Sequence, residues 1–274
     1  MQKSKILAKL LQDQDNEFEL VDLLDRMLAD KLEDNQENPF KPGETEKKNY
    51  VGIEVECFSN LNDIEVMELL IENDLENHIN IGDDGSIDES YGNSFELRIL
   101  SLERELPAVL KRLGAFFKAG KFGTNDTCGL HVHLDMRNRN VEKCYQKLLK
   151  FQHLMFPLVD KERWTNEYCI WSIETDKFSR DAVNYCAYVE HRTIEIRLHQ
   201  GTTDVKRIQN WVNLLLRAIK SPPIKDIKSK VAAVKWAGKN KALKSYINKE
   251  FKVSWFREKE DVMDHYREED NGDF

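Results

Sequence analysis

Residues 129–135 read GLHVHLD, and the strict alternation of apolar and polar residues predicts a β-strand that is buried on one face. Successive side chains of a strand point to opposite faces, so the three aliphatic residues share one face, and His131, His133 and Asp135 share the other. Paired imidazoles on one face suit a divalent ion or a phosphate, although paired surface histidines also occur without a function. The motif alone therefore does not predict a site, and the residues of the neighbouring strands have to be considered with it.

Three further stretches alternate in the same way and place charged side chains on one face. They are GIEVE at 52–56 with Glu54 and Glu56, FELR at 95–98 with Glu96 and Arg98, and TIEIRLH at 193–199 with Glu195, Arg197 and His199. Because the other face of every stretch is apolar, we expect one sheet with helices packed on its apolar side. The opposite side would gather the four glutamates with the two histidines and two arginines.

The residue types on this polar face indicate which ligands it could bind. A lone Glu-x-Glu is typical of a solvent-facing edge, but four crowded carboxylates repel one another and call for divalent cations. Oxygen ligands with one or two imidazoles favour Mg²⁺ or Mn²⁺ over Zn²⁺. Arginines cannot bind a metal, but they hold phosphoryl oxygens through two hydrogen bonds. The face therefore predicts nucleotide-dependent phosphoryl chemistry.

The composition of the chain argues against several classes of protein. The chain has 274 residues, of which 33% are charged, and no apolar run approaches the roughly 18 residues of a membrane helix. A net charge of −8 argues against a general nucleic-acid coat. The five cysteines include no C-x-x-C pair, which argues against a disulfide framework or a zinc knuckle. The first 20 residues lack a small-residue cleavage site, so we expect a cytoplasmic protein without a membrane span.

The chain divides into three parts. Residues 1–48 are expected to form a helical arm at 3–32 and a linker at 33–48, which is rich in Pro, Gly, Asn and charge. Residues 49–220 are expected to form the main α+β domain. Residues 221–274 are expected to form a charged helical extension, anchored by Trp236, Trp255 and Phe256. Its basic part, from residue 220 to 252, is either a contact for a polyanion or a solvated helix face.

Periodicity predicts the elements of the main domain. Strands are expected at 50–58, 94–100, 129–136, 185–189 and 193–199, and helices at 64–75, 102–119, 141–159 and 204–219. The second helix is expected to kink near Pro107. Strands 185–189 and 193–199 are separated by three residues, which predicts an antiparallel hairpin. Asp204 is the expected N-cap of the last helix.

The order of these motifs resembles the amidoligase family, a branch of the glutamine synthetase and glutamate-cysteine ligase superfamily. The resemblance covers residues 49–220 and rests on GIEVE, DDGS at 83–86, FELR, CGLHVHLD, and Asn184 before TIEIR and QGT. It implies a curved, mainly antiparallel sheet of glutamine synthetase catalytic-domain type. It also implies that ATP and Mg²⁺ or Mn²⁺ bind on the concave face, where a carboxylate becomes an acyl phosphate that an amine attacks.

The resemblance also implies roles for individual residues. It implies metal ligation by Glu54, Glu56, Glu96, His131 and Glu195, nucleotide contacts by His131, His133, Ser86, Asn184 and Arg197, and catalytic roles for Glu195, Arg197, Asp84 and Arg98. The substrates would be carboxylates and amines of small molecules, peptides or protein side chains, and the chain could form oligomers. The family usually continues from its third motif into Ser-Pro, whereas residues 98–103 read RILSLE, so the resemblance does not extend to the rim of the acceptor pocket.

Two alternatives from other classes remain open at the level of sequence. A non-catalytic binding or assembly protein could use the same sheet and recruit partners through its terminal segments. A metal-dependent phosphotransferase or hydrolase could use the same ions, because metal-ATP sites look alike whichever nucleophile attacks.

Overall fold

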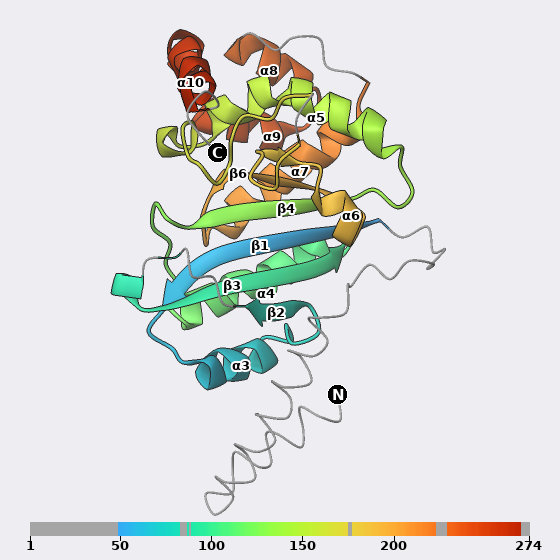
Figure 1. Ribbon diagram of the computed structural model, residues 1–274. Helices are drawn as coiled ribbons and strands as arrows, with labels where there is room; N and C mark the ends of the chain where they lie inside the picture. Colours follow the sequence, from blue (N-terminus) through green and yellow to red (C-terminus); the bar gives the residue numbers. More distant parts are fainter. Residues whose placement is uncertain (1–48, 83–86, 88, 175–176, 223–228, 270–274) are drawn as a thin grey trace, which may run out of the picture.

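The computed structural model describes residues 49–82, 87, 89–174, 177–222 and 229–269 (Figure 1). These residues form an α+β fold with one open six-stranded sheet, in the order β2-β3-β1-β4-β6-β5. Every neighbouring pair of strands is antiparallel. The predicted α+β class and the antiparallel sheet are therefore confirmed. The predicted arm and linker, residues 1–48, lie outside the described residues.

Six strands build the sheet. They are β1 (Tyr50–Ser59), β2 (Ile79–Gly82), β3 (Asn93–Leu102), β4 (Gly129–Asp135), β5 (Val183–Asn184) and β6 (Thr193–Gln200). The four motif-bearing strands, β1, β3, β4 and β6, agree with the prediction to within two residues at each end. Both strands that the sequence analysis missed, β2 and β5, are short and lie at the two edges of the sheet.

The predicted hairpin between residues 185–189 and 193–199 is wrong. Residues after β5 form a short helix, α6 (Ala187–His191), and the chain then turns through Arg192, whose φ is 56°. The side chain of Asn184 accepts a hydrogen bond from the backbone N–H of Cys186 at 2.8 Å, which turns the chain away from the sheet. This local side-chain contact outweighs the strand propensity of the Tyr and Val residues that follow.

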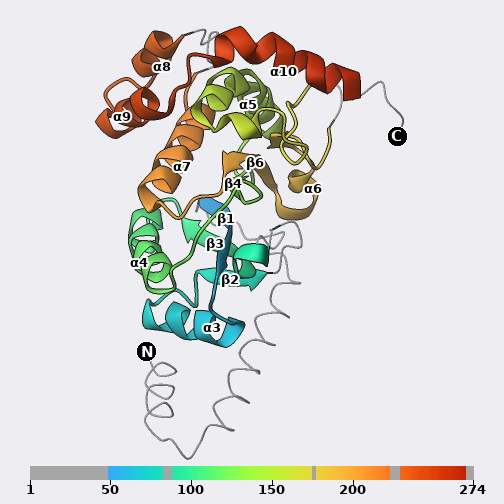
Figure 2. The same cartoon turned by 90° about the vertical axis from the view of Figure 1, so that its left-hand side faces the viewer.

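Helices cover the apolar side of the sheet. They are chiefly α4 (Leu106–Ala119), α5 (Val141–Met155) and α7 (Val205–Lys220), with α3 (Asp63–Glu72) next to α4. Figure 2 shows α4 and α7 together on one side of the strands. Pro107 lies in the first turn of α4, where its missing N–H breaks no helical bond, so the predicted kink is wrong. Asp204 caps α7 as predicted, accepting from the N–H groups of Lys206 and Arg207.

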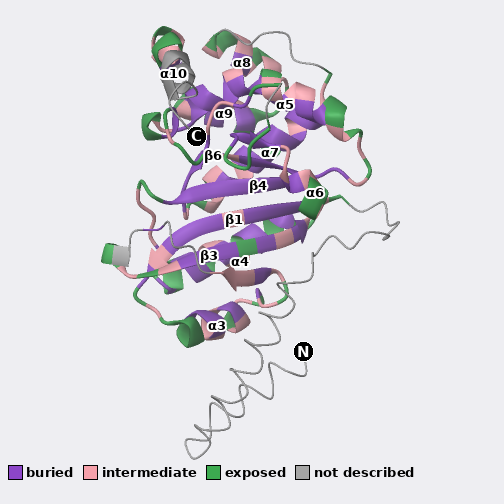
Figure 3. Cartoon of the chain, in the orientation of Figure 1, coloured by how far each residue is buried: buried purple, intermediate pink, exposed green. Residues whose placement is uncertain are grey.

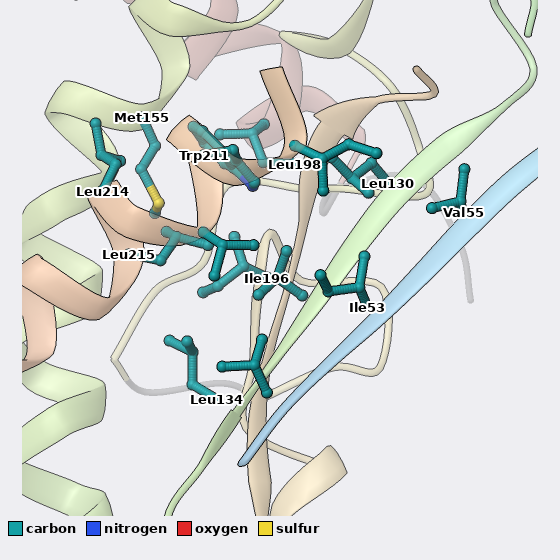
Figure 4. Close-up of a cluster of buried hydrophobic side chains, with 14 of the residues drawn as sticks. Ile53, Val55, Leu130, Leu134, Met155, Ile196, Leu198, Trp211, Leu214 and Leu215 are labelled. Carbon is teal, nitrogen blue, oxygen red and sulfur yellow. The ribbon is translucent and has the colours of Figure 1, made fainter. Parts of the chain in front are cut away.

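The core lies between this side of the sheet and the helices. Figure 4 shows Met155 of α5 and Trp211, Leu214 and Leu215 of α7 facing aliphatic side chains of β1, β4 and β6. The central strands are buried along almost their whole length (Figure 3). Burial of the apolar side fixes which residues of each strand face the other way, and so it places the charged side chains together.

A β-bulge in β6 changes the predicted set of polar residues. Leu130 pairs with His199 but Val132 pairs with Ile196, so two residues of β6 lie opposite His131. The bulge reverses the alternation beyond it, and His199 therefore faces the apolar side, where its ring packs against Trp211 with centroids 4.9 Å apart. The expectation that His199 shares a face with Glu195 and Arg197 is wrong for this reason.

The buried His199 makes stability depend on pH. Burial, and then the nearby Arg207, lower the pKa of this fully buried side chain to about 3. An unfolded His titrates near pH ~6.5, so as the pH falls below that value the unfolded chain binds the proton first. The stability from keeping His199 neutral is thus present above pH ~6.5 and is lost as the pH falls toward 3.

We expect His199 to lower the free energy of unfolding by about 2 kcal/mol between pH 7 and pH 5. Urea titrations at both pH values give the free energy of unfolding of the wild type and of His199→Gln. The change with pH in the wild type minus the change in the variant is the contribution of His199, because the other groups contribute equally to both proteins. Identical pH dependence in the two proteins would contradict the expectation.

The described part of the C-terminal segment contains three helices joined by short turns, in agreement with the helical segment that was predicted. It forms α8 (Lys230–Trp236), α9 (Lys241–Glu250) and α10 (Trp255–Glu269). Trp255 is fully buried and packs against Phe156 and Trp164, so it is an anchor as expected. No helix among the described residues is both long enough and apolar enough to cross a membrane.

Candidate metal centre

The polar side of β1, β4 and β6 gathers the charged residues of the three motifs. In the antiparallel register Glu54 of β1 lies opposite His131 of β4, and His133 lies opposite Glu195 of β6. His131, His133 and Glu195 are buried, and Glu54 is partly exposed. These side chains therefore meet away from bulk water, where charge interactions are strong.

Three of these side chains converge on one point. His131 Nδ1 lies 3.1 Å from Glu54 Oε2 and 3.5 Å from Glu195 Oε1. One ligand atom from each of the three residues lies within 4.8 Å of the other two. Among the residues that the structure describes, no other group of three or more His, Cys, Asp or Glu converges in this way.

The converging atoms fit a small divalent cation. Neighbouring ligands of an octahedral Mg²⁺ lie roughly 3 Å apart, because each is about 2.1 Å from the ion. The two distances from His131 Nδ1 are close to this value. Two carboxylates and one imidazole also suit Mn²⁺ or Mg²⁺ better than Zn²⁺. Glu54, His131 and Glu195 could therefore hold a divalent cation of the kind that the sequence predicts.

Protein cations also neutralise this cluster. His133 Nε2 lies 3.1 Å from Glu54 Oε1 and 4.0 Å from Glu195 Oε1. Burial would lower the pKa of His133, but Glu54 and Glu195 outweigh it and raise this pKa to about 9. Burial would raise the pKa of Glu54, but His133 and His131 hold it well below the usual range. The imidazolium of His133 therefore supplies part of the positive charge beside these carboxylates.

Glu195 is held by two more of the predicted residues. Arg197 donates from Nη1 to Glu195 Oε1 at 2.7 Å, and Asn184 donates from Nδ2 to Glu195 Oε2 at 2.7 Å. Arg197 also donates from Nε to the carbonyl oxygen of Tyr168, which fixes the plane of its guanidinium. The structure therefore brings Arg197 and Asn184 into the cluster, both through Glu195.

Glu96 and Arg98 lie on the neighbouring strand β3. Glu96 is opposite Glu56, and Arg98 is opposite Glu54. Glu96 and Arg98 form an ion pair with each other, in which Glu96 is largely buried and Arg98 is about half exposed. Burial and the nearby Glu54 raise the pKa of Glu96 to about 7, although Arg98 opposes this. Glu96 does not belong to the converging group, so its predicted role as a ligand has no support from this geometry.

Of the remaining predicted residues, Asp135 is described by the structure. Asp84 and Ser86 are outside the described residues. Asp135 lies at the end of β4 and accepts two hydrogen bonds from the guanidinium of Arg137, at 3.0 and 2.8 Å, so it takes no part in the cluster.

Sequence reasoning missed four residues that contact the cluster. Thr193 Oγ1 lies 3.0 Å from His133 Nδ1, and the ring of His191 meets that of His133 edge to face at 5.8 Å. A Cβ on Gly52 would lie 3.0 Å from His133 Cβ, so the glycine leaves room for the ring. The backbone N–H of Gly129 donates to Glu56 Oε2 at 2.5 Å. Thr193 and both glycines stand inside the quoted motifs, and the glycines could have signalled a close approach.

No protein-family model matches the chain, and a search of curated proteins finds no similar sequence. The assignment of function therefore depends on the geometry of this cluster and on the motif resemblance.

Proposed function

We propose that the chain is an ATP-dependent carboxylate-amine ligase of the amidoligase type. The observation that supports it is the convergence of Glu54, His131 and Glu195, with Arg197 bound to Glu195. The open antiparallel sheet with helices on one side supports the finer proposal that the fold is of glutamine synthetase catalytic-domain type.

In this proposal the chain's own residues act on a nucleotide and a carboxylate. A bound divalent cation would neutralise the phosphate oxygens of ATP and make the terminal phosphoryl group more electrophilic. Glu54, His131 and Glu195 would hold that cation. Arg197 would release part of its contact with Glu195 and hold the phosphoryl group as it passes to the substrate carboxylate. The resulting acyl phosphate loses phosphate when an amine attacks its carbonyl carbon, which forms the amide.

The half-exposed Arg98 gives the polar face a second arginine, beside β2. Its guanidinium is suited to a substrate carboxylate, and Asp84 and Ser86 are proposed to approach the same substrate. We place the reaction in the cytoplasm, because none of the five cysteines, which all lie in the described part of the chain, forms a disulfide.

Turnover of ATP tests this proposal. The full-length protein is incubated with Mg²⁺, ATP, mixed carboxylates without a free amine, such as N-acetylated amino acids and peptides, and either an amine or hydroxylamine. We expect release of ADP and phosphate only when a carboxylate and a nucleophile are both present, with a hydroxamate as the product from hydroxylamine. ADP release without a carboxylate would favour a hydrolase, and phosphorylation of a hydroxyl acceptor would favour a phosphotransferase. No turnover, with metal binding intact, would favour the binding protein.

A further inference from the structure

Glu56 lies next to the converging group without joining it. Its side chain is 7% exposed, and both carboxylate oxygens have neighbours. Oε2 accepts the backbone N–H of Gly129 at 2.5 Å, and Oε1 lies 3.4 Å from His131 Nε2. The carboxylate is therefore held from the backbone on one side and faces the histidine on the other.

The two ring nitrogens of His131 face different carboxylates. Nδ1 faces Glu54 and Glu195, at 3.1 and 3.5 Å, whereas Nε2 faces only Glu56 among these three. A metal-bound imidazole uses the lone pair of one nitrogen and carries a proton on the other. The arrangement thus separates a metal-facing nitrogen from a nitrogen that can donate its proton.

Gly129 makes this arrangement sterically possible. A Cβ at this position would lie 2.8 Å from His131 Nε2 and 3.1 Å from Glu56 Oε2. Any larger residue would have to push the imidazole and the carboxylate apart. The glycine that precedes the His-x-His motif therefore has two functions, because it donates to Glu56 and also leaves the space in which Glu56 approaches His131.

We propose that Glu56 is a positioning residue of the metal centre and not one of its ligands. It accepts the Nε2–H of His131 and so presents the Nδ1 lone pair to a cation between Glu54 and Glu195. Outer partners of this kind typically change metal affinity 10–100-fold. The inference rests on the proposed metal-dependent function, and it replaces the ligand role that the family resemblance implies for Glu56.

Cadmium NMR on the full-length wild type tests the inference without any substitution. The protein carries ¹⁵N-labelled histidine and is loaded with ¹¹³Cd²⁺ as a probe of the metal centre. We expect a ¹¹³Cd–¹⁵N coupling to Nδ1 of His131 and a protonated Nε2. Coupling to Nε2 would overturn the inference.

Titration with Mn²⁺, followed by the EPR signal of the free ion, provides the second test. We expect Glu56→Gln to weaken binding by about 10–100-fold, and Glu54→Gln to weaken it at least tenfold more. Glu103→Gln is the matched control, because Glu103 is a partly buried carboxylate that pairs with Arg139 and Lys220 away from the centre. Equal losses for Glu56→Gln and Glu54→Gln would make Glu56 a ligand and overturn the inference. If the wild type bound no divalent ion, the proposed function would fail and the inference with it.

Discussion

Replacing Glu54 with glutamine is expected to weaken Mn²⁺ binding by ~100-fold or more, beyond the range for the loss of an outer partner. The substitution removes a ligand oxygen of full charge while it keeps the shape of the side chain. It also leaves the charged His133 with Glu195, 4.0 Å away, as its nearest remaining carboxylate in the cluster. A cation would then meet an uncompensated imidazolium in its own site.

Calorimetric titration of Mn²⁺, with and without ATP, measures this loss. Glu54 is the most exposed of the three proposed ligands, so its replacement should disturb the fold least. Far-UV circular dichroism and thermal melting of the variant check that the sheet is intact. Unchanged affinity in a folded variant would remove Glu54 from the metal centre.

Replacing Arg197 with lysine is expected to lower kcat by ~100-fold or more, while the affinity for ATP changes little. Arg197 is bound to Glu195 and to the carbonyl oxygen of Tyr168, so its guanidinium is oriented before any substrate arrives. Lysine keeps the charge but loses the planar group that holds two phosphoryl oxygens at once. The loss should therefore appear in the transition state more than in nucleotide binding.

A purely structural role for Arg197 would give another result. The pair with Glu195 would then contribute to folding only, and the substitution would lower the melting temperature while turnover stayed near that of the wild type. Asn184→Ala is a useful comparison, because Asn184 holds the other oxygen of Glu195 but carries no charge. We expect Asn184→Ala to affect Mn²⁺ binding more than kcat.

The alternation in four strands predicted most of the sheet and most of the site. Glu54, His131 and Glu195 could be placed together because the apolar faces of β1, β4 and β6 must all be buried on the same side. The bulge in β6 could not be predicted, since TIEIRLH alternates without interruption and only pairing with β4 shows where the register shifts. His199 was misplaced for that reason.

Two other features depend on distances that a single sequence does not contain. The neutralisation of Glu54 by His133 requires a contact across β1 and β4, between residues 79 positions apart. The outer position proposed for Glu56 depends on its hydrogen bond with the backbone N–H of Gly129, the first residue of β4. The i, i+2 spacing of Glu54 and Glu56 places both on one face, but it does not show which of them reaches the metal.

A crystal of the full-length protein soaked in Mn²⁺, with diffraction data collected at the manganese absorption edge, tests the central claim most directly. The account predicts an anomalous peak between Glu54, Glu195 and Nδ1 of His131, with Glu56 outside the coordination sphere and still bonded to the N–H of Gly129. No peak at this position in a crystal where the cluster is open to solvent, or a peak bound by other residues, would contradict it.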